Sequence, residues 1–305
     1  MKYNSFLSVS DMSPNDIGAI IKRASQLKTS YSSKPLEDKT VALIFEKPSL
    51  RTRVSFEIGI RRLGGESIYI TKEEIGLGVR EPVQDVAHVL SQWVDCIVAR
   101  VFSHTNLELL AEHADVPVIN ALSDYEHPCQ ALADLLTIYE HKDKLKGTRV
   151  AFIGDGNNVA SSLALACASV ETEFYIATPT AYEIPHNVWQ KALEIASLSN
   201  TVIEQMNSPE DAVRGADVVY TDVWASMGQE HERDKRIKCF KDYQVDETLM
   251  SKAKPNAIFM HDMPAHRGEE ISDGMLEDDR SVVFDQAENR LHAQKAILAK
   301  LFSGF

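Results

Sequence analysis

Hydroxyl groups at Ser49 and Thr52 and a guanidinium at Arg51 lie between an apolar run and an amphipathic segment. The run Thr40–Phe45 predicts a buried strand, and the apolar spacing of residues 54–63 predicts a helix whose N-cap is Ser49. A helix start offers unpaired backbone N–H groups and the positive end of the helix dipole, which suit a phosphate dianion. The pattern therefore predicts a phosphate site, and the alternative is an ordinary capped helix with solvated arginines.

Three further motifs follow along the chain and form a specific combination with this segment: His127–Gln130, Asp222–Gly228 and His261–Pro264. The segment Phe284–Arg290 belongs to the same pattern. In their order and spacing, these motifs resemble the aspartate/ornithine carbamoyltransferase family nearly end to end. The resemblance implies an enzyme that transfers the carbamoyl group of carbamoyl phosphate to the δ-amine of L-ornithine, giving L-citrulline and phosphate. It also implies no cofactor, no metal and a homo-oligomer, expected to be a trimer.

The resemblance assigns ligands to the first substrate. Carbamoyl transfer needs an uncharged amine to attack a carbonyl, an oxyanion to be stabilised and phosphate to leave. The residues expected to bind carbamoyl phosphate are Ser49, Leu50 (through its N–H), Arg51, Thr52, Arg100, His127, Gln130 and Arg290. Those expected to act in catalysis are Arg100, His127, Gln130, Asp262 and Arg290.

Some of these assignments also follow from position in the chain. Arg100 comes at the end of a predicted strand, where an open α/β sheet binds its ligands. His127 and Gln130 are one helical turn apart and could point at the same carbonyl oxygen. The alternatives are a capping histidine, a surface glutamine and, for Arg290, a surface salt bridge.

The resemblance places the ligands of the amine in the second half of the chain. Asp222 follows the predicted strand 218–221 and could bind an α-ammonium group. The residues expected to bind L-ornithine are Asn158, Asp222, Ser226, Met227, Asp262 and Met263. The charged segment 225–238 is expected to be a loop that closes as a lid and expels water, and the alternative is a solvated connector.

Asp262 and Met263 stand where the family usually has Cys-Leu. An aspartate there adds a second carboxylate near Asp222, and two nearby carboxylates couple so that one pKa rises. The alternative is that Asp262 turns away to pair with Arg267. Because of this departure, the identity of the amine substrate is open, and putrescine and an N-acylated ornithine are the alternatives to ornithine. A non-catalytic protein that binds carbamoyl phosphate is a further alternative.

The turn from Gly154 to Asn158 lies between an apolar strand and a helix, which resembles a dinucleotide-binding fingerprint. The third small residue of that fingerprint is missing, and no acidic residue ends the next strand. Carboxamides at Asn157 and Asn158 instead suit an amino-acid carboxylate, and the resemblance favours Asn158 as the ligand. The alternatives are an NAD-dependent oxidoreductase and a left-handed Asn turn.

Composition narrows the partners and the location. A formal charge of −13 and no lysine- or arginine-rich block argue against nucleic acid. The first 13 residues lack a basic, then apolar, signal pattern, and no apolar run approaches the ~18 residues of a membrane helix. Four scattered cysteines without CxxC pairing fit reduced thiols. We therefore expect a cytoplasmic protein with no membrane partner.

Apolar runs alternate with helical patterns along the whole chain and predict two doubly wound α/β domains with mostly parallel sheets. The runs expected as later strands are 67–70, 96–99, 116–119, 150–153, 174–177, 202–204, 218–221, 258–260 and 282–284. The polar segment 141–147 suggests the boundary. Residues 1–141, with the C-terminal helix 285–305 packing back on them, are expected to bind carbamoyl phosphate, and residues 142–284 to bind ornithine.

Overall fold

A computed structural model of the 305-residue chain describes residues 5–29, 34–226, 228 and 230–304. The strands are β1 (Thr40–Phe45), β2 (Glu66–Thr71), β3 (Cys96–Arg100), β4 (Val118–Leu122), β5 (Arg149–Ile153), β6 (Glu173–Ala177), β7 (Ile203–Met206), β8 (Val218–Thr221) and β9 (Ile258–His261). The helices are α1 (Pro14–Thr29), α2 (Leu50–Arg62), α3 (Lys72–Ile75), α4 (Val83–Leu90), α5 (His104–His113), α6 (Pro128–Lys142), α7 (Asn158–Ser169), α8 (His186–Ser197), α9 (Pro209–Val213), α10 (Arg233–Phe240), α11 (Glu247–Met250) and α12 (Val283–Ser303). Short 3-10 helices cover Val9–Asp11, Glu230–Glu232, Lys241–Tyr243 and Met275–Glu277.

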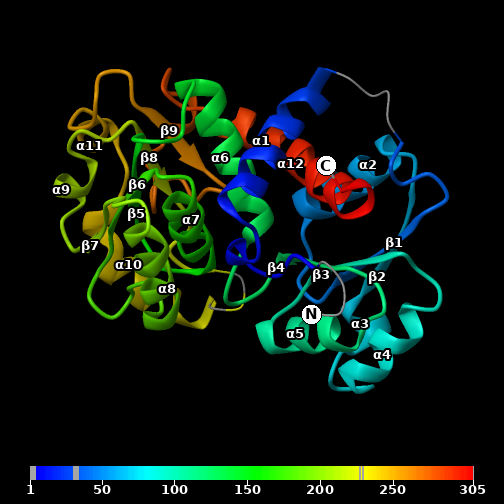
Figure 1. The fold of residues 1–305 in the computed structure, drawn as a ribbon. Coiled ribbons are helices and arrows are strands. Elements are labelled where there is room, and N and C mark those ends of the chain that lie inside the picture. Colours follow the sequence, from blue (N-terminus) through cyan, green and yellow to red (C-terminus); the bar gives the residue numbers. More distant parts are fainter. Residues whose placement is uncertain (1–4, 30–33, 227, 229, 305) are drawn as a thin grey trace. The chain divides into compact units, whose positions relative to one another are not determined.

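The strands form two sheets, which Figure 1 shows with their helices. One sheet has the order β2-β1-β3-β4 and the other the order β7-β6-β5-β8-β9. All the pairings between these strands are parallel. The predicted fold class, α/β with parallel sheets, is confirmed.

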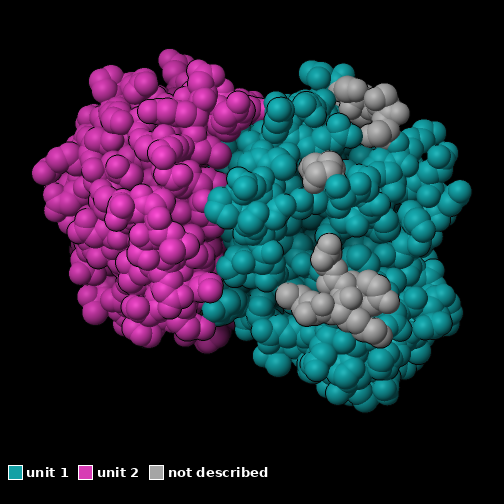
Figure 2. All heavy atoms as spheres, viewed as in Figure 1, with its two compact units in different colours: residues 1–136, 289–305 teal, residues 137–288 magenta. Residues whose placement is uncertain are grey.

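The chain divides into two compact units, coloured separately in Figure 2. Unit 1 comprises residues 1–136 and 289–305, and unit 2 comprises residues 137–288. The divisions fall inside α6 and α12 and not in the polar segment 141–147. Unit 1 is therefore discontinuous in sequence, whereas unit 2 is one continuous stretch.

Burial on both faces explains the unbroken apolar character of the central strands. In β1, every residue after Thr40 is buried, and β3 is buried throughout. Parallel strands of this kind need helices on both faces, because each crossover connection covers the sheet. In unit 2, α7 packs against α8, and α9 packs against α11.

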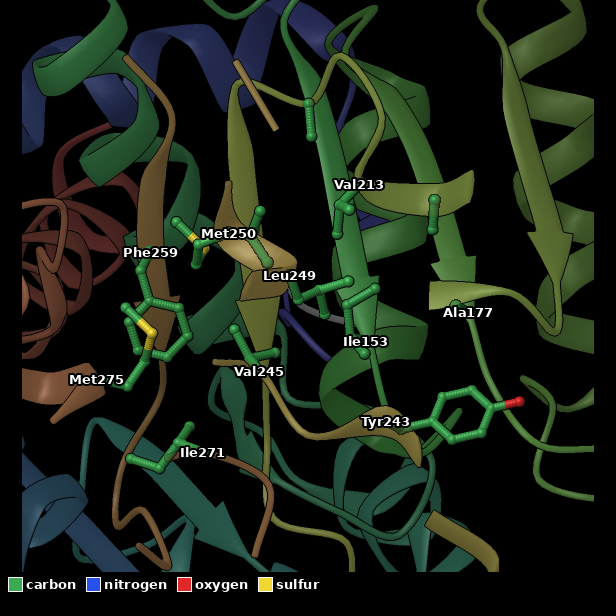
Figure 3. Packing of buried hydrophobic residues seen from close by; sticks show 14 of the residues in the cluster. Ile153, Ala177, Val213, Tyr243, Val245, Leu249, Met250, Phe259, Ile271 and Met275 are labelled. Atoms are coloured by element: carbon green, nitrogen blue, oxygen red, sulfur yellow. The ribbon is translucent and has the colours of Figure 1, made fainter. Parts of the chain in front are cut away.

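The core of unit 2 fixes the strand ends that carry functional groups. It joins Ile153 of β5 and Phe259 of β9 to Val213 of α9 and Leu249 of α11. Figure 3 shows Met275 beside the Phe259 ring. Fully burying one such side chain stabilises the fold by roughly 1.5–3 kcal/mol. This packing holds the ends of β5 and β9 in place.

Two predictions about elements were wrong. The run 282–284 is not a strand, because α12 begins at Val283, and the neighbouring Ser281 forms an isolated bridge with Phe259. The segment 225–238 is not a loop throughout, because α10 begins at Arg233. None of the helices in the described part of the chain is long and apolar enough to span a membrane.

Candidate active site

Each sheet reverses its winding at one place, and polar side chains gather there. In unit 1, β1 lies between β2 and β3, and in unit 2, β5 lies between β6 and β8. Connections leave in opposite directions from the carboxyl ends of such central strands, which opens a crevice for ligands. The segments after β1 and β3, and after β5 and β8, carry most of the residues singled out from the sequence.

The predicted phosphate segment begins α2 directly after β1. Ser49 is the N-cap, with its hydroxyl accepting the Thr52 N–H at 3.3 Å, and this part of the prediction is confirmed. Leu50 is exposed and Arg51 is half-buried at the helix start. Glu46 fixes the preceding turn, because its carboxylate accepts the Phe102 N–H at 2.8 Å. The helix start is therefore held in place by the segment that follows β3.

Two guanidinium groups donate hydrogen bonds to a single hydroxyl. Arg290 of α12 donates to Thr52 Oγ1 at 2.6 Å, and Arg100, at the end of β3, donates to the same atom at 3.4 Å. Thr52 is fully buried, and both arginines are buried. Two like charges repel each other at such a spacing, so an anion bound there would relieve the repulsion. The surface salt bridge considered for Arg290 is excluded by its burial.

His127 lies at the start of α6 in the same unit. Its carbonyl accepts the backbone N–H groups of Gln130 and Ala131, at 3.0 and 3.2 Å. Burial, reinforced by the positive charges of Arg290 and Arg100, holds the pKa of His127 well below its usual range. The imidazole is therefore neutral at pH 7 and can donate a hydrogen bond without carrying charge.

Gln130 is buried one turn into α6, and its amide orientation follows from its partner. Its Nε2 donates to the Asp134 carboxylate at 2.8 Å, and a carboxylate oxygen only accepts. Its Oε1 is buried with no hydrogen-bond partner in the described part of the chain. Gln130 thus offers an acceptor. The expectation that it shares a carbonyl oxygen with His127 stays a prediction, which this orientation does not favour because a carbonyl oxygen needs donors.

In unit 2, the turn after β5 is joined to the segment after β8. Asn157 is the N-cap of α7, and its Oδ1 accepts the N–H groups of Val159 and Ala160. Its Nδ2 donates to Asp222 at 2.7 Å. Its backbone is extended, which rules out a left-handed turn at this residue. The carboxamide of Asn157 is therefore engaged at both its oxygen and its nitrogen, and Asn158 is the first residue of α7.

Asp222 and Asp262 form a carboxylate pair. Burial raises the pKa of Asp222 well above its ordinary value, and the charge of Asp262 and a hydrogen bond between the two side chains raise it further. Arg267 binds Glu277 instead, at 2.5 Å, so the alternative pairing of Asp262 with Arg267 is wrong. An oxygen of each carboxyl group lies within 4.8 Å of the other, a spacing at which two carboxylates couple.

A buried histidine shapes the segment that carries Asp262. His261 Nδ1 accepts the Met263 N–H at 2.9 Å, so its Nε2 carries the proton and donates to Glu270 at 3.0 Å. Met263 has a φ of 60°, in the left-handed region. The histidine thus holds a turn that the backbone would otherwise disfavour.

Arg236 of α10 was missed in the sequence, where it reads as one charge among many. It donates to Asp155 at 2.8 Å and to the Trp224 carbonyl at 2.9 Å, and it pairs with Glu232 at 3.1 Å. Burial raises the pKa of Asp155 to about 6, although Arg236 opposes that shift. Arg236 thereby joins the turn after β5 to the segment after β8. Ser226 lies in that segment and is half-buried, whereas Met227 is outside the described residues.

The packing around Gly156 argues against the alternative of a dinucleotide-binding site. A Cβ added there would lie 2.2 Å from the backbone nitrogen of Ile184, and the Gly156 N–H donates to the Tyr182 carbonyl at 2.8 Å. In a dinucleotide site the corresponding glycine lets the pyrophosphate approach. Here the glycine accommodates the backbone of residues 182–184 instead.

Comparisons with known proteins agree with these features. The carbamoyl-P binding domain of aspartate/ornithine carbamoyltransferase matches residues 4–140, and the Asp/Orn binding domain matches residues 146–301. The chain belongs to the aspartate/ornithine carbamoyltransferase family.

Relatives named ornithine carbamoyltransferase are similar over the full length. The protein from Pyrococcus abyssi is 48% identical over 308 residues, covering 100% of this chain and 97% of its own. That from Carboxydothermus hydrogenoformans is 51% identical over 300 residues, covering 97% and 96%. The solved structure from Pyrococcus furiosus has a TM-score of 0.95 at 47% identity, covering 99% and 97%. An acetylornithine transcarbamylase complexed with acetylcitrulline has a TM-score of 0.88 at 29% identity, covering 98% and 99%.

The shared hydroxyl gives a first prediction. Thr52→Val should weaken carbamoyl phosphate binding by about 1.5–3 kcal/mol, because two buried guanidinium groups lose a common acceptor and their placement. Calorimetric titration measures this, and Thr52→Ser, which keeps the hydroxyl, is the control. Equal affinity of the valine and serine variants for carbamoyl phosphate would show that the hydroxyl does not contribute to binding.

The Arg236 contacts give a second prediction. Arg236→Met should lower the free energy of unfolding by about 3–5 kcal/mol in urea titrations, because Asp155 stays buried without its partner. The KM for the amine should rise, while carbamoyl phosphate affinity stays within a few-fold. The exposed Arg214→Met is the matched control. A KM unchanged in a folded Arg236→Met protein would show that these contacts do not position the amine ligands.

Proposed function

We propose that the protein is an ornithine carbamoyltransferase that converts carbamoyl phosphate and L-ornithine to L-citrulline and phosphate. The observation that carries the proposal is the convergence of Arg100 and Arg290 on Thr52, in the same unit as a neutral His127, at the winding reversal of a parallel sheet. Full-length relatives of that name, at 48% and 51% identity, support it.

The unit 1 residues match the parts of carbamoyl phosphate. The phosphate takes the start of α2, where Arg51, Thr52 and the Leu50 N–H supply donors at the positive end of the helix. The Ser49 hydroxyl, which donates to Thr52 Oγ1 at 3.1 Å, would turn to donate to the phosphate. The guanidinium groups of Arg100 and Arg290 balance its charge. Gln130 Oε1 accepts from the carbamoyl –NH₂, because its own amide nitrogen is held by Asp134.

The chemistry is attack of a neutral δ-amine on the carbonyl carbon. As the C–N bond forms, negative charge develops on the carbonyl oxygen, and a neutral His127 N–H together with the guanidinium groups stabilises it. The C–O bond to phosphate then breaks, a proton leaves the attacking nitrogen, and the departing phosphate is basic enough to take it. Fixed donors in a buried site supply this stabilisation without reorganisation.

The unit 2 residues favour an amino acid with a free α-ammonium group. The Asp222–Asp262 pair offers negative charge to that group, while Asn158 and the start of α7 suit the α-carboxylate. N-acylated ornithine lacks the α-ammonium and would leave the pair without a cation. Putrescine lacks the carboxylate and would leave the start of α7 without an anion. The trimer and the cytoplasmic location stay predictions.

The direct test compares amines in a carbamoyl-transfer assay on the purified protein. We expect citrulline formation with L-ornithine, and a kcat/KM at least about tenfold lower with putrescine and N-acetylornithine, since each loses one charged contact. Carbamoyl phosphate binding without turnover on any of these amines would favour a non-catalytic binding protein instead.

The carboxylate pair predicts the acid side of the pH profile. Because the pKa of Asp222 is raised, the pair takes up its proton at a higher pH than a lone aspartate, and kcat/KM for ornithine should fall as pH decreases through that pKa. In Asp262→Asn the neighbouring charge is gone, so the inflection should move to lower pH. The exposed Asp279→Asn serves as control. Superimposable profiles for wild type and Asp262→Asn would contradict the coupling.

A further inference from the structure

A second group of ligand atoms lies in unit 2, in the segment that follows Asp262. His266 Nδ1 and one carboxylate oxygen each from Glu269 and Glu270 lie within 4.8 Å of one another. This group is separate from the side chains assigned to either substrate. Imidazole nitrogen and carboxylate oxygen are ligands that zinc accepts together.

The spacing inside the group is that of ligands and not of hydrogen bonds. His266 Nδ1 lies 3.9 Å from Glu269 Oε2 and 3.9 Å from Glu270 Oε2, and both distances exceed hydrogen-bond length. An ion equidistant from three such atoms would lie about 2.3–2.5 Å from each, slightly beyond the ~2.0–2.2 Å of Zn–N and Zn–O bonds. Small side-chain rotations would close that difference.

The other oxygen of each carboxylate is already engaged. Glu269 Oε1 pairs with Arg233 of α10. Glu270 Oε1 accepts the His261 Nε2–H at 3.0 Å and the His266 backbone N–H at 2.5 Å. These bonds orient both carboxylates so that their second oxygens face the imidazole. Such outer partners are what fixes metal ligands in place.

Glu270 supplies the observation that points to a ligand. Its side chain is fully buried, yet Oε2 has no hydrogen-bond partner in the described part of the chain. A buried oxygen of this kind costs roughly 1–3 kcal/mol unless something binds it. His266 is 44% exposed at the other side of the group, so an ion can enter from solvent.

The alternative triad of Asp222, His261 and Asp262 has similar spacing but no available imidazole nitrogen. His261 Nδ1 accepts the Met263 N–H, and Nε2 is bound to Glu270. A metal there would have to break one of these bonds. His266 has no such constraint on Nδ1, because its contacts to both carboxylates are long.

We propose that His266, Glu269 and Glu270 form a binding site for a divalent cation of the zinc class, with water completing the coordination. The ion binds Nδ1 of the histidine and Oε2 of each glutamate. The bound ion ties the segment 266–270 together and, because it favours the folded state, stabilises the protein by mass action.

The test titrates Zn²⁺ into the chelator-treated full-length protein by calorimetry. We expect one site whose affinity falls at least about tenfold in His266→Ala and in Glu269→Gln, since loss of a direct ligand costs at least the 10- to 100-fold of an outer-shell change. Saturating Zn²⁺ should raise the melting temperature of the wild type but not of His266→Ala. A Zn²⁺-soaked crystal should place anomalous density among the three ligand atoms.

Two variants separate this site from other binding. The exposed His186→Ala should bind Zn²⁺ like the wild type, and so should Asp262→Asn. Loss of the site in Asp262→Asn, with His266→Ala unaffected, would place the ion in the other triad and overturn the proposal. Millimolar binding of equal strength in all variants would overturn it as well.

Discussion

The hydroxyl of Thr52 is the point on which the candidate site of unit 1 depends. It joins the start of α2, the end of β3 and the helix α12, which are 48 and 238 residues away in sequence. Its oxygen accepts from both guanidinium groups, which brings two positive charges together beside the start of α2. Burial lowers the pKa of His127, and the same two charges lower it further, so this arrangement also favours the neutral imidazole.

The candidate residues of the two units lie at similar positions relative to their sheets but carry opposite charges. In each, most of the candidate residues follow the two strands that flank the reversal of winding, β1 and β3 in one and β5 and β8 in the other, while His127 and Gln130 follow β4 and Asp262 follows β9. Unit 1 brings two guanidinium groups together, whereas unit 2 brings two carboxyl groups together. Asp262 therefore adds a second carboxyl group beside Asp222, and its charge raises the pKa of that neighbour.

Features set by local chemistry could be predicted from the sequence, and those set by distant contacts could not. Ser49 was recognised as an N-cap because capping depends on neighbouring residues. The run 282–284 was misread because a short apolar segment begins a buried helix as readily as a strand. Arg236 and the acceptor role of Gln130 depend on Asp155 and Asp134, whose proximity only the fold creates. Which residues act on substrate stays a prediction.

The division of the chain inside α12 has a consequence for synthesis. Unit 2 is one continuous stretch that ends at residue 288. Unit 1 begins first but lacks Arg290 and the buried Lys295, whose Nζ donates to the Leu27 carbonyl at 2.8 Å, until residues 289–305 follow. Because chains are made from the N-terminus, residues 1–136 of unit 1 are made before residues 289–305, which they contact. Unit 1 is therefore completed by residues 289–305, although its strands are made before any strand of unit 2.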